Sequence, residues 1–200
     1  MSIRRNPVLR MTEPQHRRRP EFVATVDEFR ARHADALRPC IGQTIDAIWE
    51  AWDLSDDTWF ADEAVILEIG GRQLEIVWWK IGEVSLSWNA IDLTQPPNWV
   101  ADWGDIPLQW RRNAMPEFQA IIGQPVREIR LIEYLSRFSV IEDPDPAMIG
   151  RQGELWILFG LEFELASMTC SVFDNGDENG FRFEPLTGPD FRIRTLFDTH

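Results

Sequence analysis

Histidine and cysteine are scarce in this chain, and their scarcity argues against several kinds of chemistry. The 200 residues include 3 His and 2 Cys. Nucleophilic catalysis usually needs a histidine base beside a serine or cysteine, and zinc sites need clustered cysteine and histidine. None of the histidines lies in a known catalytic or metal-binding motif. We therefore identify no catalytic residue and expect a non-enzymatic protein without metal or cofactor.

Three other features are missing. There is no glycine-rich phosphate loop, which leaves nucleotide binding without support. No apolar run approaches the roughly 20 residues that span a bilayer, and the N-terminus lacks the apolar segment of a signal peptide. Cys40 and Cys170 lie far apart and form no disulfide framework. These absences predict a soluble cytoplasmic protein.

Aromatic residues and acids are abundant. The chain is 44% hydrophobic, with 10 Trp and 12 Phe, which is enough for a folded core. Its formal net charge is −13. Such a surface repels nucleic acids and anionic membranes. It attracts a basic protein.

The charge is divided unevenly along the chain. The first 40 residues hold nine arginines and five acids, a net charge of +4, so the remaining residues carry −17. Arg17, Arg18 and Arg19 form the densest basic run. We expect residues 1–20 to form a flexible arm. A nucleic-acid contact or a contact with the acidic body stays open for this arm.

A helix is predicted after the arm. Thr25 is followed three residues later by Glu28, which is a capping-box pattern. One apolar face then follows at helical spacing: Val26, Phe29, His33 and Leu37. Pro39 ends the run. We interpret His33 as a core or boundary histidine rather than a catalyst.

Strand patterns dominate from Ile41 onward. Alternating segments flank Gly70 and Gly71, which is a strong hairpin signal. The segment "EVSLSWN" predicts a third strand, and "MPEFQAIIG" predicts a short middle helix with Pro116 in its first turn. Adjacent Trp78 and Trp79 place one ring on each face of a strand, so we expect both faces to be covered.

An internal echo suggests two copies of one unit. "IGQTIDAIWEAWDL" begins at Ile41 and "IGQPVREIRLIEYL" begins at Ile122, an offset of 81 residues. A hairpin-like apolar segment follows each one, and in the second copy Gly160 falls where a turn is expected. The opening of each copy also fits a helix, but the second copy favours a strand. Duplicated units usually pack face to face or extend one sheet.

We predict an α+β fold that is mainly antiparallel β-sheet, built from meanders and hairpins. It has an N-terminal helix, a short middle helix and a two-copy arrangement. The expected parts, packed as one globular domain, are a basic arm (1–20), the helix (21–40), a first β unit with a Trp/Pro-rich loop (41–121) and a second β unit (122–200).

The stretch "DNGDENG" at 174–180 resembles a calcium loop in composition. An EF-hand loop needs a bidentate Glu at position 12. Counting from Asn175, that position is Leu186, which cannot bind a cation. The flanking segments alternate like strands, and Asn and Gly suit a tight turn. We therefore predict the turn of a late hairpin, with its acids contributing surface charge.

The loop at 92–110 interleaves tryptophan with aspartate. Trp99, Asp102, Trp103 and Asp105 could form a sugar site, where rings stack on a pyranose and two carboxylates act as acid and base. The simpler interpretation is that the rings plug one end of the sheet while the acids cap turns. We favour this second interpretation.

The leading functional hypothesis is an acidic protein that binds a basic protein partner. Candidate contacts are Asp53, Asp56, Asp57, Asp62 and Glu63, with Trp99, Asp102, Trp103 and Asp105. Bacterial immunity proteins, which neutralise a basic toxin, share this acidic, tryptophan-rich composition, although no motif matches. Two alternatives stay open. One is a carbohydrate-binding or carbohydrate-active domain using residues 92–110, and the other is an assembly subunit, including a homo-oligomer, docking through Arg17, Arg18 and Arg19.

Overall fold

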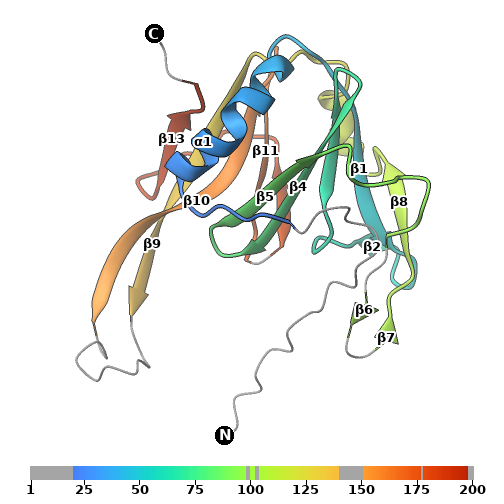
Figure 1. Cartoon of the computed structure of the whole chain (residues 1–200), viewed down its shortest axis with the longest axis horizontal. Coiled ribbons are helices and arrows are strands. Elements are labelled where there is room, and N and C mark those ends of the chain that lie inside the picture. The colour runs from blue at the N-terminus through green and yellow to red at the C-terminus, as the bar shows by residue number, and fades with distance from the viewer. Residues whose placement is uncertain (1–19, 98–99, 102–103, 140–150, 177, 198–200) are drawn as a thin grey trace, which may run out of the picture.

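The computed structural model describes residues 20–97, 100–101, 104–139, 151–176 and 178–197 (Figure 1). Strands dominate the described chain. The helices are α1 (Val26–Leu37) and two 3-10 segments, η1 (Arg38–Cys40) and η2 (Pro116–Ala120). The strands are β1 (Ile45–Asp53), β2 (Thr58–Trp59), β3 (Val65–Ile69), β4 (Arg72–Lys80), β5 (Glu83–Trp88), β6 (Val100–Ala101), β7 (Gly104–Asp105), β8 (Leu108–Arg112), β9 (Glu128–Ser139), β10 (Gln152–Glu164), β11 (Thr169–Asp174), β12 (Asn179–Arg182) and β13 (Phe191–Thr195).

Two antiparallel sheets make up the body. The first has the order β2-β1-β3-β4-β5, with β8 also paired to β1, and the second has the order β12-β11-β10-β9-β13. The main hydrophobic core contains buried side chains from both sheets and from α1. The predicted α+β fold with antiparallel meanders is therefore confirmed. The predicted middle helix is the 3-10 segment η2.

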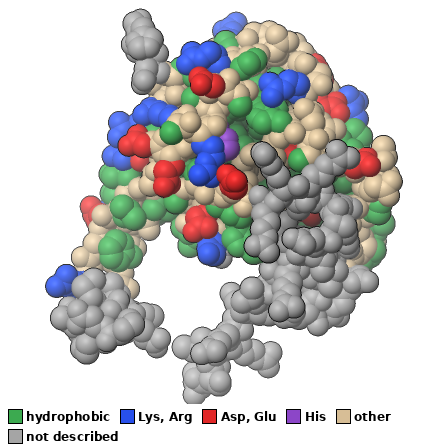
Figure 2. Space-filling view, viewed as in Figure 1, with side chains coloured by type: hydrophobic (Ala, Val, Ile, Leu, Met, Phe, Trp, Pro, Cys, Tyr) green, Lys and Arg blue, Asp and Glu red, His purple; other side chains and the backbone are tan. Residues whose placement is uncertain are grey.

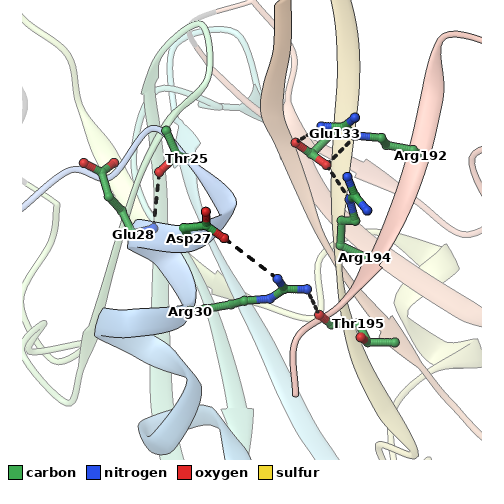
Figure 3. Close-up of polar contacts among 8 residues, drawn as sticks. All are labelled: Thr25, Asp27, Glu28, Arg30, Glu133, Arg192, Arg194 and Thr195. Carbon is green, nitrogen blue, oxygen red and sulfur yellow. Dashed lines mark hydrogen bonds and ion pairs between the residues drawn. The ribbon is translucent and has the colours of Figure 1, made fainter. Parts of the chain in front are cut away.

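Helix α1 forms as its sequence predicts. The Thr25 side chain accepts a hydrogen bond from the backbone N–H of Glu28 at 3.2 Å (Figure 3). The Glu28 carboxylate in turn accepts from the backbone of Ala24 at 3.3 Å, so orphan amides of the first turn are satisfied. Phe29, which is 1% exposed, leads the buried face of the helix.

Helix α1 closes the side of the molecule at which both sheets end. β5 and β13 are terminal strands of their sheets. Arg30 of α1 donates to the Thr195 carbonyl in β13 at 2.5 Å (Figure 3). Just before the helix, Val23 pairs with Val84 of β5. The helix thus connects the two free edges (Figure 1).

Strand β13 is attached to β9 by a shared carboxylate. Arg192 and Arg194 both donate to Glu133 of β9, at 2.6 and 2.9 Å (Figure 3). Burial by itself raises the pKa of Glu133, but the hydrogen bonds from the two arginines outweigh it and lower that pKa. A buried charge is therefore compensated on the inner side of the edge.

The glycine pair at the first hairpin adopts the expected conformation. Gly70 and Gly71 have φ values of 56° and 76°. Positive φ at both central residues is the type I′ turn that suits the twist of a two-residue hairpin. β3, β4 and β5 then form the predicted meander.

Both faces of the first sheet are covered, as the adjacent tryptophans predict. Trp78 is 1% exposed in the main core. On the opposite face, Trp79 packs with Leu108, and its ring centroid lies 6.4 Å from that of Phe22. A smaller cluster that includes Ile66 and Val77 lies on this face as well.

The two Ile-Gly-Gln segments pair with each other. The Gly42 amide donates to the Val126 carbonyl at 2.8 Å. Its counterpart 81 residues later, Gly123, donates to Ile45 at 2.8 Å. Each bond maps onto the other under the offset of the sequence echo. The pairing therefore has the form of a two-fold axis, and we call it the repeat joint.

A second pair of bonds in the repeat joint obeys the same offset. The Ile45 amide donates to Gln124 at 3.1 Å, and the Val126 amide donates to Gln43 at 2.8 Å. The glycine before each segment is also equivalent in conformation, with φ of 83° at Gly42 and 80° at position 123. Both copies therefore enter their first strand along the same backbone path.

The expected turn at Gly160 is wrong. β10 runs through this residue, and the pairing with β9 shifts there, which marks a bulge. A Cβ at Gly160 would lie 3.1 Å from atoms of Ile132 and Phe173, so the neighbours leave little room. The turn comes later, where the Leu165 amide donates to Met168 at 2.8 Å. Glycine in a strand often marks a bulge, and this one was mistaken for a turn.

The "DNGDENG" stretch is the β11–β12 hairpin turn, as predicted. Asp174 pairs with Asn179 across the strands. The backbone amide of Asn175 donates to Glu178 at 2.9 Å. The expectation of surface charge is wrong for Asp174, which is 3% exposed and accepts a hydrogen bond from Gly82 of the first sheet at 2.7 Å.

Asn179 connects the two sheets from this hairpin. It is fully buried, and its Oδ1 accepts from the Trp78 amide at 3.2 Å. Its Nδ2 donates to the carbonyls of Ala61 and Glu63 at 2.9 and 2.8 Å. One amide side chain therefore satisfies three backbone groups of the first sheet.

Replacing Asn179 with alanine should strongly destabilise the fold. Asn179→Ala leaves a buried N–H and buried carbonyls without these bonds, so we expect a loss of roughly 3 kcal/mol in the free energy of unfolding by urea denaturation. Asn175→Ala is the matched control, because Asn175 is exposed in the same turn and its side chain bonds only to Glu178. We expect it to lose less than about 1 kcal/mol. Equal losses would contradict the connecting role of Asn179.

The repeat joint predicts equal effects at its two glycines. Ideal Cβ atoms at Gly42 and Gly123 meet nothing within 4 Å, so only the positive φ opposes a side chain. Gly42→Ala and Gly123→Ala should each lower the free energy of unfolding by about 1–2 kcal/mol. A thermal or urea denaturation series that found a loss at one glycine alone would show that the segments are not equivalent.

Candidate binding surfaces

The acidic turn between β1 and β2 contains three of the predicted partner contacts. Asp56 and Asp57 are exposed and Asp53 is half-buried. The Asp53 carboxylate accepts from the backbone of Ser55 at 2.7 Å, which closes the turn. Leu54 between them is 47% exposed. The turn therefore presents an apolar side chain beside carboxylates.

Asp57 is held in place by its neighbours. It accepts from the Trp52 indole at 2.9 Å and pairs with Arg111 at 2.8 Å. These contacts, the Arg111 hydrogen bond first, lower the pKa of Asp57. The Arg111 guanidinium also lies 4.7 Å from the centre of the Trp52 ring. Asp57 therefore has a local cation, whereas Asp56 is the more available acid.

Glu63 does not belong to this exposed surface. It is 7% exposed, and its carboxylate accepts from the Ala64 amide at 3.0 Å. Burial raises the pKa of Glu63 to about 7, and the charge of Asp62 adds to that effect. Asp62 itself is half-buried. Of the predicted acids in this region, only those of the turn face solvent freely.

The predicted site in the 92–110 loop is only partly described. Trp99, Asp102 and Trp103 lie outside the described residues, as do Arg17, Arg18 and Arg19 of the arm. The backbone of Asp105 pairs with Val100.

Nearby described residues of this loop have structural roles. The Trp110 side chain is 6% exposed in the smaller core cluster. Asp92 accepts from the Thr94 amide at 3.0 Å and caps a turn. The interpretation of the loop as plug and caps is therefore confirmed at these two residues.

A groove that the sequence reasoning missed lies between α1 and β5. It has a volume of about 560 Å³, and we call it the α1–β5 groove. Arg32, His33 and Ala36 line it from the helix, and Ser85 and Ser87 line it from the strand. Side chains alternate along a strand, so these serines lie on the face opposite the core residues between them. Their small size leaves the hollow open.

Glu75 lies in the floor of the groove, on the neighbouring strand β4. It is 1% exposed, and it accepts hydrogen bonds from the Ser87 hydroxyl and from the amides of Ala90 and Ile91, the last two at 2.6 and 2.8 Å. These bonds hold the chain that leaves β5 against the sheet. No basic side chain among the described residues lies within ion-pair distance of this carboxylate.

His33 lines the wall of the groove. It is 8% exposed, and its ring centroid lies 5.0 Å from that of Phe29. Burial, with a smaller effect from the Arg32 charge, lowers the pKa of His33 to about 4. The imidazole is therefore neutral at physiological pH, and its Nε2 has no partner among the described residues. In Figure 2 this purple side chain is visible among side chains of both charges.

The described residues offer no metal site and no reactive thiol. No group of three or more His, Cys, Asp or Glu in the described part of the chain could hold a metal ion. Cys40 and Cys170 are buried and unpaired. Burial raises the pKa of Cys170 to about 12 and raises that of Cys40 as well. The prediction of Cys170 as a small buried residue is confirmed.

Comparison of the chain with models of known protein families, with curated proteins and with solved structures finds no match. Within the described ranges, none of the helices has the length and apolar character needed to cross a bilayer. The functional argument therefore depends on the residues themselves.

Neutralising Glu63 should stabilise the protein above neutral pH. The pKa of Glu63 is about 7 in the folded state and near 4.5 when exposed. The folded state thus pays no penalty below about pH 4.5, and the penalty grows as pH rises through 7. Glu63→Gln should raise the free energy of unfolding by roughly 2–3 kcal/mol at pH 8.5 and by less than about 1 kcal/mol at pH 5.

Urea denaturation at the two pH values measures this difference. Asp56→Asn is the control, since Asp56 is an exposed acid of the nearby turn and should change stability little at either pH. A gain for Glu63→Gln that did not depend on pH would contradict an ionised buried carboxylate as its cause.

Proposed function

We propose that this chain is a non-enzymatic binding protein whose partner is a basic protein. The supporting observation is how the charges are paired. The described residues include 14 basic side chains. Ten of them already lie within 4.0 Å of a carboxylate: Arg30, Arg32, Lys80, Arg111, Arg112, Arg130, Arg137, Arg182, Arg192 and Arg194. The charge left unpaired is therefore mainly carboxylate.

The acidic turn between β1 and β2 is the proposed contact region. Asp56 supplies an exposed charge, and Leu54 beside it supplies an exposed apolar anchor. Complementary charges speed the encounter of two proteins, and an apolar side chain that becomes buried contributes most of the contact energy. Neutralisation of a basic toxin, as by an immunity protein, is one biological role that this chemistry would serve.

Salt dependence tests the steering. A partner is first identified by affinity purification from the native host, and its association rate is then measured by stopped flow. Between about 50 and 500 mM salt we expect the rate to fall by roughly tenfold or more, because salt screens exposed charges. A rate that stays flat would contradict a charge-steered partner.

The acidic turn has its own test. Asp53→Asn combined with Asp56→Asn should slow association at low salt by about threefold or more. Asp35→Asn is the matched control, because Asp35 is an exposed acid on α1, away from the turn. Equal effects of the two variants would show that overall charge matters and that the turn does not.

A further inference from the structure

The outer edge of β5 carries backbone groups that no described residue uses. Val84 and Val23 exchange two hydrogen bonds of 2.9 Å, so the Val84 backbone points away from β4. Hydrogen-bonding direction alternates along an antiparallel strand. The N–H and C=O groups of Leu86 and Trp88 therefore point the same way, and no described segment pairs with them. The edge accepts a strand at Val84 and is open beyond it.

The open part of the edge borders the α1–β5 groove. Leu86 and Trp88 line this groove, together with Ala36 on the helix side. Its volume of about 560 Å³ falls in the range of sites that enclose a ligand. A helix beside an unpaired strand edge, with a hollow between them, is the geometry in which an extended peptide adds to a sheet.

The groove has negative charge left over. Arg32 on its rim lies 3.6 Å from Glu21, which compensates that cation. Glu75 in the floor is bonded only by a hydroxyl and two amides. The groove therefore favours a cationic side chain, which agrees with the sign of the whole surface.

We propose that the α1–β5 groove binds an extended segment of the basic partner, which adds to β5 as a further strand. The inference rests on the proposed function for the charge of that partner. The segment exchanges backbone hydrogen bonds with Leu86 and Trp88. Because strand side chains alternate, one Lys or Arg of the segment lies over Ser85 and Ser87, towards Glu75.

The probe is a five-residue peptide, acetyl-Val-Arg-Val-Arg-Val-amide, titrated into the ¹⁵N-labelled full chain. We expect the amide signals of Leu86 and Trp88 to shift, with a dissociation constant below about 1 mM. The same peptide with Glu in place of Arg should bind at least about tenfold more weakly. A backbone N-methylated version should not bind, because it cannot complete the strand pairing.

A matched pair of helix variants localises the binding. Ala36→Phe fills the groove and should weaken peptide binding by about tenfold or more. Ala31→Phe places the same ring on an exposed position of α1 outside the groove and should leave binding unchanged. Should Ala36→Phe fail to fold, the N-methylated peptide still tests the pairing on the unaltered chain.

Several results would overturn the proposal. These are the absence of shifts at Leu86 and Trp88 at several millimolar peptide, equal binding to folded Ala36→Phe, and equal affinity for N-acetyl-arginine amide. The last result would show a side-chain pocket without strand addition. Failure here is separable from failure of the proposed function: a salt-sensitive partner that binds Ala36→Phe normally removes only the groove. A peptide that binds the groove beside a salt-insensitive partner removes only the steering.

Discussion

The four backbone hydrogen bonds of the repeat joint determine where the main elements lie. They join the segments that lead into β1 and β9, the first strand of each meander. Once these strands are placed, each meander carries its apolar face toward the other, and the core forms between them. The β4–β5 and β11–β12 turns then meet, so that Asp174 reaches Gly82. The terminal strands β5 and β13 also fall within reach of one helix.

What could be predicted from the sequence was mostly local. The Thr25 cap and the Gly70-Gly71 turn depend on neighbours within a few residues, and the structure confirms both. The repeat was visible as an echo, but its mutual pairing joins residues 81 positions apart. The connecting role of Asn179 was hidden because turn composition alone explains an asparagine there. The groove was missed because it results from small side chains, Ser85 and Ser87, and has no motif of its own.

Composition also overstated how acidic the surface is. Glu50 and Glu63 are buried, and burial raises the pKa of each to about 7. Near neutral pH, these two carboxyl groups carry only part of their formal charge. Glu162 is buried against Arg130, and Glu133 is held by two arginines. A partner therefore meets the acids of turns and rims, and the formal charge of −13 is an upper limit on the charge it meets.

A two-fold contact of this kind is closed, because each copy uses the same patch that the other uses. Neither half has a second such patch with which to recruit a third copy, so the pairing ends at two. Carrying both halves on one chain also makes their association intramolecular, and it no longer falls away on dilution. Symmetry then ceases to be required elsewhere. One half has gained a covered outer face and β8, while the other has lengthened its opening strands into β9 and β10, with 12 and 13 residues.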